Sequence, residues 1–388
     1  MSYVSSLKLH NFRCYKQAAL EDLSPGLVVL HGPNGAGKTN ILEALSILTP
    51  GRGLRSAKVM EIQCQKAGTP WAVSAKVKDN DIAIQIGTGL DQQTGKRTVR
   101  IQGETVKSQA ALADHIACVW LAPQMDGLFL DASRERRRFL DRLVFAFDPG
   151  HSGRVLRYEN AMRQRSKLLR EEKAEPVWLS SLESQIAETG VAIAAARLDF
   201  IQRLQTACNE AQTSLFPLAT LSANGTLESL LQNAPALEVE EMFQYQLAES
   251  RGVDMLTGGA ATGPHKSDLH VKYAEKNMPA DQCSTGEQKA LLIGIILAHA
   301  RLIAAERGAP PILLLDEIAA HLDENRRAAL YDILKVLGGQ AWLTGTDDNL
   351  FETVKHTAQF FDVQEAKLSP TTYAGNVTPI TKTANVVV

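Results

Sequence analysis

The apolar residues of the segment 27–48 follow two different periods in turn. Leu27 to Leu30 are four consecutive apolar residues, which is typical of a buried strand. A glycine-rich turn follows, and from about Lys38 the apolar residues return at the spacing of an amphipathic helix. The segment therefore predicts a strand, a turn and a helix, around which the rest of the chain is organised.

Alternation of apolar and polar residues predicts further strands in the first third of the chain. The expected strands span residues 4–15, 18–23, 71–77, 81–87, 97–106 and 116–124. We expect the first of these, Val4–Tyr15, to be an edge strand that runs into a turn. The three strands between 71 and 106 are separated by turn signals, so they predict a small antiparallel sheet attached to the core.

The composition changes at about Ser133, where helical patterns begin. A helix is expected to start there with Ser133 as its N-cap, and two longer helices follow at about 150–173 and 177–213. The break at Glu175-Pro176 and the apolar residues at helical spacing predict an antiparallel hairpin with one buried face. Residues 219–260 are mixed, and the strand-like segment 268–273 is expected to lead back to the core.

Length and composition are those of a soluble globular protein with two lobes. The chain has 388 residues, of which 45% are hydrophobic and 22% are charged. We expect residues 1–130 to form one lobe of the core with its β-subdomain, 131–256 a helical lobe, and 257–388 a return to the core. No apolar run approaches the roughly 20 residues of a membrane span, and the N-terminus lacks the core of a signal peptide. Five dispersed cysteines favour reduced thiols in the cytosol.

The turn after the first buried strand carries the spacing Gly32-x-x-x-x-Gly37-Lys38-Thr39. Glycines in such a turn let several backbone N–H groups face one concavity at the positive end of the following helix. A lysine there can place its charge on the β- and γ-phosphates, and a threonine hydroxyl can ligate Mg²⁺. A chance match in a glycine-containing loop is the alternative. The preceding strand and following helix favour a nucleotide site.

Two carboxylates close a second buried strand, Ile312-Leu-Leu-Leu-Asp-Glu317. Because a central parallel strand delivers its carboxyl end to the ligand crevice, this is the Walker B arrangement. Asp316 is expected to hold Mg²⁺, and Glu317 to orient or deprotonate the attacking water. The alternative is a pair of surface acids at the end of a strand.

The segment Cys283-Ser-Thr-Gly-Glu-Gln-Lys289 precedes a long apolar helix. Ser284 and Glu287 have the spacing of a capping box, which would account for both residues structurally. The same helix N-terminus, with Ser284 and the Gly286 amide, could receive the γ-phosphate of a nucleotide held by a second subunit. Both interpretations can hold together.

Together these motifs resemble the ABC-type ATPases. Walker A at 32–39, the Ser-x-Gly-x signature at 284–287, Walker B at 312–317 and Ala320-His-Leu-Asp323 in the D-loop position carry the likeness. Leu9-His-Asn-Phe-Arg-Cys-Tyr15 and Asn34-Gly-Ala-Gly-Lys-Thr-Asn-Ile-Leu-Glu-Ala-Leu45 narrow it to the branch with SMC-like and RecF proteins. Arg134-Glu-Arg-Arg-Arg-Phe-Leu-Asp141, Thr262-Gly-Pro-His-Lys-Ser-Asp-Leu269 and the short helical insert resemble the bacterial RecF family.

The resemblance implies an α/β fold of the P-loop NTPase class, an ABC-type ATPase head. Its mixed sheet would carry an attached antiparallel β-subdomain and an inserted helical lobe. The implied function is a weak DNA-dependent ATPase of recombination and repair, which dimerises on ATP, hydrolyses it slowly and helps load recombinase at single-strand gaps. The implied cofactors are ATP and Mg²⁺. The implied partners are single- and double-stranded DNA at gaps or junctions, RecR, RecO and a second copy of the chain, in the cytoplasm with the nucleoid and without a membrane.

The resemblance also implies roles for individual residues. Glu317 and Lys38 would be catalytic, and Thr39, Asp316 and Gln124 would serve the metal. The nucleotide would contact Arg13, Gly32, Pro33, Asn34, Gly35, Ala36, Gly37, Lys38, Thr39, Asn40, Ser284, Gly286 and Asp323. DNA would contact Arg134, Arg136, Arg137, Arg138, Arg154 and Arg157, unless this charge run is only a solvated helix face. Reversing Arg136, Arg137 and Arg138 is accordingly predicted to weaken duplex binding.

Two positions depart from the broader ABC pattern. Cys283 begins the signature, and Thr285 stands where glycine is commoner, which could slow dimerisation. After the strand at 341–344 the γ-phosphate sensor could be Thr344 or Thr346, where transporters have histidine.

Two other protein classes fit the sequence less well. A structural SMC-like DNA clamp would need a far longer coiled coil than residues 150–213 provide. A transporter subunit would lack the helical hairpin and its arginines.

Overall fold

The strand before the glycine-rich turn lies inside a six-stranded sheet. The computed structural model describes residues 2–64, 68–79, 82–171, 175–210 and 215–373. Across the sheet the strands are β15 (Lys367–Thr371), β14 (Gln359–Gln364), β3 (Leu27–His31), β13 (Ala341–Gly345), β12 (Ile312–Leu315) and β8 (Cys118–Leu121). All neighbours are parallel except β14 and β15, so the expected mixed sheet is confirmed. The carboxyl ends of β3, β8, β12 and β13 therefore meet at one edge.

A second six-stranded sheet is antiparallel throughout. Its order is β2 (Tyr15–Leu20), β1 (Ser2–Phe12), β4 (Ala72–Asp79), β5 (Ile82–Leu90), β6 (Arg97–Ile101) and β7 (Glu104–Val106). The expectation that the first strand lies at an edge is wrong, because β1 pairs with β2 on one side and β4 on the other. The expected strand 97–106 is two strands, since Gln102 and Gly103 both adopt positive φ in the turn between them.

Helices and short 3₁₀ turns complete this part of the molecule. They are α1 (Lys38–Ser46), α9 (Glu324–Leu337), η1 (Val59–Ile62), η2 (Gln109–Asp114), η3 (Pro123–Met125), η5 (Ile318–His321) and η6 (Asp348–Val354). Apolar side chains of both sheets and of α1 fill one core, in which Trp71 and Trp342 are among the largest fully buried residues. This shared core fixes the start of α1 against the end of β3.

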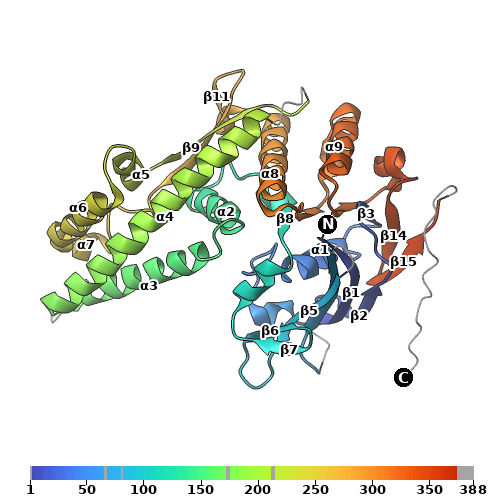
Figure 1. Cartoon of the computed structure of the whole chain (residues 1–388), viewed down its shortest axis with the longest axis horizontal. Helices are drawn as coiled ribbons and strands as arrows, with labels where there is room; N and C mark the ends of the chain where they lie inside the picture. Colours follow the sequence, from blue (N-terminus) through green and yellow to red (C-terminus); the bar gives the residue numbers. More distant parts are fainter. Residues whose placement is uncertain (1, 65–67, 80–81, 172–174, 211–214, 374–388) are drawn as a thin grey trace. The chain divides into compact units, whose positions relative to one another are not determined.

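The described chain divides into two compact units, residues 1–125 with 300–388 and residues 126–299. The second unit holds α2 (Ser133–Phe145), α3 (His151–Arg170), α4 (Pro176–Glu210), β9 (Ala219–Asn224), α5 (Thr226–Leu231), α6 (Ala236–Glu249), α7 (Arg251–Thr257), β10 (Asp268–Tyr273), β11 (Met278–Pro279), η4 (Ala280–Gln282) and the start of α8 (Thr285–Arg307) (Figure 1). The expected division at 256/257 is therefore misplaced. Residues 257–299 belong with the helices because β10 pairs with β9 and β11 in a separate three-stranded sheet.

The predicted helical hairpin is present as α3 and α4, with Pro176 as the first residue of α4. Proline suits that position because the N–H it lacks would have no partner inside the helix. One local expectation is wrong. Ala132, not Ser133, is the N-cap of α2, and Ser133 is instead the helix's first residue. The mixed segment 219–260 contains a strand and three helices.

One helix among the described residues, α8, is long and apolar enough to cross a membrane by length and composition, with a mean hydropathy of 1.5 in its best window. From the sequence we expected no apolar run long enough to span a membrane. In the structure 67% of that window is buried, as it is for a helix in a protein core.

Candidate functional site

The glycine-rich turn bends tightly between β3 and α1. Gly32 has φ of +144°, and a Cβ there would lie 2.2 Å from the carbonyl oxygen of Val363. Gly37 has φ of +118°, and its Cβ would meet the Tyr15 hydroxyl at 2.6 Å. Both positions therefore require glycine. Within the predicted contact set, Pro33, Asn34 and Gly35 are exposed, whereas Gly32, Ala36 and Gly37 are buried.

Lys38 folds back over this turn. Its ammonium donates to the carbonyl oxygens of Gly32 at 2.7 Å and Pro33 at 2.9 Å, and the residue is only 4% exposed. Burial lowers the pKa of Lys38, while the nearby carboxylates of Glu317 and Asp316 oppose that shift. The turn thus holds a buried cation at the first residue of α1, where the helix dipole adds further positive potential.

Residues from three segments meet at the carboxyl edge of the parallel sheet. The Thr39 hydroxyl lies 3.0 and 2.9 Å from the two carboxylate oxygens of Asp316. The Thr344 hydroxyl donates to Asp316 Oδ1 at 2.7 Å and accepts from the Glu317 amide at 2.8 Å. Glu317 adopts a left-handed conformation with φ of +55° at the end of β12, a position that costs backbone strain in a non-glycine residue.

This arrangement fits a hard divalent cation that shares its coordination with phosphate. Mg²⁺ commonly takes one or two protein carboxylates or hydroxyls and fills the other positions with water and phosphate oxygens. Thr39 and Asp316 supply one hydroxyl and one carboxylate at a single point. Burial raises the pKa of Asp316, although hydrogen bonds from Thr344 and Thr39 oppose the shift, so a cation at this point would favour the ionised form. No group of three or more His, Cys, Asp or Glu side chains suited to a metal occurs among the described residues.

Two further residues predicted for the nucleotide site, Gln124 and Asp323, lie beyond the ends of the neighbouring strands β8 and β12. Gln124 is exposed in η3, just beyond β8, and β8 lies next to β12 through the bond from the Asp316 amide to the Leu121 carbonyl. Asp323 is the N-cap of α9, where its carboxylate accepts from the Arg326 amide at 2.9 Å. The structure thus gives Asp323 a capping role in this chain, and its role toward a nucleotide stays a prediction.

Arg13 is engaged by an acid that sequence inspection did not single out. Its guanidinium donates to both carboxylate oxygens of Glu43, at 2.9 and 2.5 Å, and to the Glu61 carbonyl at 2.6 Å. Glu43 is fully buried in α1 and also lies 3.5 Å from Arg55, which donates to the Asn40 side chain at 2.9 Å. Arg13 therefore stabilises α1 through its ion pair with Glu43, and any contact of Arg13 with a nucleotide stays a prediction. The sequence contains one sign of this ion pair, because Glu43 is a charged residue inside the otherwise apolar run Ile41–Leu45.

The signature segment lies in the second unit and forms the expected capping box. The Ser284 amide donates to the Glu287 carboxylate at 2.9 Å, and the Glu287 amide approaches the Ser284 hydroxyl at 3.4 Å. The hydrogen bond from Lys276 lowers the pKa of Glu287 to about 2, so this box holds at neutral pH. Ser284 and Gly286 are exposed, and a Cβ on Gly286 would meet open space. Cys283 points inward, is buried and bonds the Pro279 carbonyl.

The predicted DNA-binding arginines divide into two kinds. Arg136 donates to both oxygens of Asp268, at 2.8 and 2.6 Å, and Arg137 donates to the Ser267 carbonyl at 2.6 Å. Arg154 pairs with Asp148. These three side chains connect parts of the helical unit. The remaining three, Arg134, Arg138 and Arg157, are exposed. Replacing Arg136 or Arg137 would therefore disturb the fold as well as any surface charge.

Comparisons with known proteins identify the family of this chain. A family model described as RecF/RecN/SMC N terminal domain matches residues 3–369. The DNA replication and repair protein RecF of Mesorhizobium japonicum is 48% identical over 95% of this chain and 98% of its own length. The protein of the same name from Agrobacterium fabrum is 48% identical over 94% of this chain and 98% of its own.

The fold has a solved counterpart as well. A structure of the recombination mediator protein RecF-ATPrS in the RecFOR pathway aligns with a TM-score of 0.83 and 22% identity, and covers 95% of this chain and 98% of its own. At that identity the likeness concerns the fold alone. The family match and the two relatives nearly half identical in sequence go further, and the chain belongs to the RecF group of the RecF/RecN/SMC family.

Proposed function

We propose that this protein is an ATP-dependent, DNA-binding ATPase of recombination and repair. The observation that carries the proposal is the meeting of Lys38, Thr39, Asp316 and Glu317 at one edge of the parallel sheet. A buried cation, a metal-ligating hydroxyl and two carboxylates at such an edge are what phosphoryl transfer requires. The relatives named RecF, described as DNA replication and repair proteins, supply the biological setting.

In this proposal each residue acts on one part of the nucleotide. The backbone N–H groups of residues 32–37 and the start of α1 bind the phosphates. Lys38 leaves the carbonyls of Gly32 and Pro33 and places its charge on the β- and γ-phosphates. Mg²⁺ supplies charge neutralisation of the phosphate oxygens when it is bound, and Thr39 and Asp316 would hold it, with Gln124 as a further candidate. Glu317 orients the attacking water and accepts its proton.

In this proposal ATP switches the protein from monomer to dimer, which requires a second copy of the chain. Ser284 and the Gly286 amide are exposed at the N-terminus of α8, where an anion is favoured. We infer that they contact the γ-phosphate held by the other subunit, with Asp323 nearby. ATP would then favour the closed dimer by binding it more tightly than it binds the monomer. Hydrolysis removes the bridging phosphate, and slow turnover lets the closed dimer persist on DNA.

The dimer would serve DNA at single-strand gaps or junctions. The solved RecF structure that shares this fold is that of a recombination mediator in the RecFOR pathway. We propose that this chain likewise works with RecR and RecO to load recombinase, in the cytoplasm at the nucleoid. The exposed residues Arg134, Arg138 and Arg157 are the proposed phosphate contacts.

Binding and hydrolysis of ATP test the proposal. We expect the wild type to bind a fluorescent ATP analogue in the presence of Mg²⁺ and to hydrolyse ATP slowly. Lys38→Met should lose binding, whereas Glu317→Gln should keep binding and lose hydrolysis, because Glu317 acts only on the water. Chelation of Mg²⁺ should weaken both. Equal ATP binding by the wild type and a folded Lys38→Met variant would contradict the assignment of the site.

A further inference from the structure

The helical unit contains a long segment without basic residues. No lysine or arginine occurs between Arg203 and Arg251, while that segment contains six glutamates, Glu210, Glu228, Glu238, Glu240, Glu241 and Glu249. The preceding helices α2 and α3 carry the arginines considered above for DNA. Glu228 is buried, and most of the other glutamates lie on α6, so this helix is the acidic part of the unit and disfavours contact with a phosphate backbone.

Helix α6 combines these acids with exposed apolar side chains on one face. Its buried face consists of Val239, Phe243 and Leu247. Leu237 and Tyr245 lie on the opposite face at helical spacing and are 69% and 66% exposed. The directly following α7 exposes more apolar residues, including Leu256 at 82%. We define the α6–α7 face as the exposed residues Leu237, Glu238, Glu241, Tyr245 and Glu249 of α6 together with the exposed Leu256 of α7.

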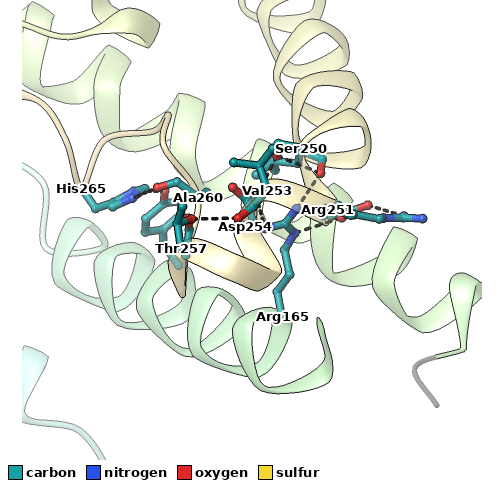
Figure 2. A network of polar contacts seen from close by, with 12 residues as sticks. Arg165, Ser250, Arg251, Val253, Asp254, Thr257, Ala260 and His265 are labelled. Carbon is teal, nitrogen blue, oxygen red and sulfur yellow. Dashed lines mark hydrogen bonds and ion pairs between the residues drawn. The ribbon is translucent and has the colours of Figure 1, made fainter. Parts of the chain in front are cut away.

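A buried network holds this face rigidly on the hairpin (Figure 2). Arg165 of α3 is fully buried and donates to Glu183 of α4 at 2.9 Å, to Asp254 of α7 at 2.7 Å and to the Leu247 carbonyl of α6 at 2.5 Å. Arg251, the first residue of α7, donates to Glu183 at 3.0 and 2.5 Å. One arginine thus joins four helices. A face fixed in this way loses little conformational entropy when a partner binds.

The face lies at the opposite end of α4 from the signature segment (Figure 1). Arg251 bonds Ser180 and Glu183 near the start of α4, whereas Gln205 near its end bonds the Leu221 amide of β9. The 22 residue steps from 183 to 205 span about 33 Å of helix at the usual rise. β9 pairs with β10, and β10 pairs with β11, which ends a few residues before Ser284. A dimer contact built around Ser284 therefore lies toward the β9 end of α4, away from the α6–α7 face.

We propose that the α6–α7 face docks a partner protein whose surface presents apolar side chains surrounded by lysines and arginines. Tyr245 would be the main anchor, because tyrosine is enriched among the residues that carry most of the binding energy of protein interfaces. Leu237 and Leu256 would add buried apolar area beside it. Glu238, Glu241 and Glu249 would steer the basic partner and exclude DNA. The inference rests on the proposed function for its probes, RecR and RecO, the mediator proteins with which the chain is proposed to act.

Two pairs of substitutions on α6 test the apolar and the charged contributions separately. Purified RecR and RecO of the same organism are the probes, and binding to each is measured by calorimetry at low and moderate salt. Leu237→Ser with Tyr245→Ser should weaken binding of at least one probe tenfold or more. Glu238→Lys with Glu241→Lys should weaken it as well and reduce its dependence on salt. These residues are exposed, so both variants should fold.

A matched control lies on the exposed side of α3. Leu156, which is 56% exposed, and Glu159 are replaced by Ser and Lys. We expect this control to bind like the wild type, and all three variants to keep ATP binding. Three results would each overturn the proposal. Both α6 variants could bind the probes with wild-type affinity, the control could lose as much affinity as the α6 variants, or the wild type could bind neither probe. A change in the oligomeric mass of either α6 variant relative to the wild type, measured without a probe, would also overturn it, because the face would then bind a second copy of the chain. ATP binding to the wild type decides the proposed function separately.

Discussion

Thr344 illustrates how one hydroxyl can organise the carboxylates of this site. It is 1% exposed, donates to Asp316 at 2.7 Å and accepts from the Glu317 amide at 2.8 Å. Both of its hydrogen-bonding functions are therefore directed at the end of β12. This position is better suited to holding the two acids than to sensing a phosphate, and Thr346, which is exposed, remains the candidate sensor.

Replacing Thr344 with valine tests that positioning role. Loss of a buried hydrogen-bond partner costs about 1–3 kcal/mol, and a cost of that size in the transition state corresponds to about a tenfold slower step for each 1.4 kcal/mol. We expect Thr344→Val to reduce the rate of ATP hydrolysis about tenfold, with ATP affinity changed by about twofold or less. Single-turnover hydrolysis and ATP titration measure the two effects separately.

Conservative controls distinguish this role from simple packing. Thr344→Ser keeps the hydroxyl and should retain most of the rate, and Thr346→Val should leave the Asp316 contacts intact. If Thr344→Val hydrolyses ATP like the wild type, or Thr344→Ser is equally impaired, the hydroxyl does not position the acids.

Sequence spacing identified the residues of the site that act within one motif. Lys38 and Thr39 follow from the glycine pattern, and Asp316 and Glu317 follow from the end of a buried strand; the structure brings Lys38, Thr39 and Asp316 together. The partners supplied by distant segments could not be predicted in this way. Glu43 lies opposite Arg13 across 30 positions, and no local pattern encodes such a pair.

Elements with a strong period were predicted well, and elements defined by pairing were not. The strands β3 and β12 and the helix α1 begin within a residue or two of their expected positions. The neighbours of β1 could not be read from its own alternation, because a strand with one polar face can be central or at an edge. The segment 219–260 was missed because β9, α5 and α7 are short and because its elements are stabilised by packing on the hairpin of α3 and α4.

Arg165 makes the assembly of these helices testable. Removing one member of a buried ionic network leaves its partners without compensation, which costs about 3–5 kcal/mol. We expect Arg165→Ala to lower the melting temperature of the helical unit in calorimetry and to increase its cleavage by protease, because Glu183 and Asp254 lose a shared donor.

Arg163 is the matched control, since it lies two residues away on α3 and is exposed. Arg163→Ala should melt like the wild type. An unchanged melting temperature in Arg165→Ala would show that the network contributes little to holding α6 and α7.

At the scale of the whole molecule, the boundaries of the units were harder to predict than their contents. The core motifs lie in residues 1–125 and 300–388, as the sequence indicated for most of them, but the signature segment begins α8 within the helical unit. The assignment of 268–273 to the core failed because β10 finds its partners in β9 and β11. A strand's sequence does not specify which of two sheets it joins.

The proposed DNA-binding surface takes its exposed arginines from two helices, α2 and α3. We expect reversal of Arg134, Arg138 and Arg157 to glutamate to weaken duplex binding and to reduce the salt slope by about one for each lost phosphate contact. All three side chains are exposed, so the fold should persist. Fluorescence anisotropy at several salt concentrations measures both quantities.

The control carries the same change in charge at another surface. Lys96, Arg100 and Lys107 are exposed in or beside the antiparallel sheet, and their reversal should leave the salt slope unchanged. Equal weakening in both variants would attribute the effect to net charge and remove the assignment of the three arginines.

The ATP-dependent dimer is tested most directly by mass from light scattering, with and without ATP and Mg²⁺. We expect the wild type to change from monomer to dimer on addition of ATP. Lys38→Met should remain a monomer because it cannot bind the phosphates, and Ser284→Arg because its signature face is blocked. Glu317→Gln should hold the dimer longer. If ATP leaves the mass of the wild type unchanged, or if Ser284→Arg dimerises normally, the nucleotide does not bridge two subunits and Ser284 serves only to cap α8.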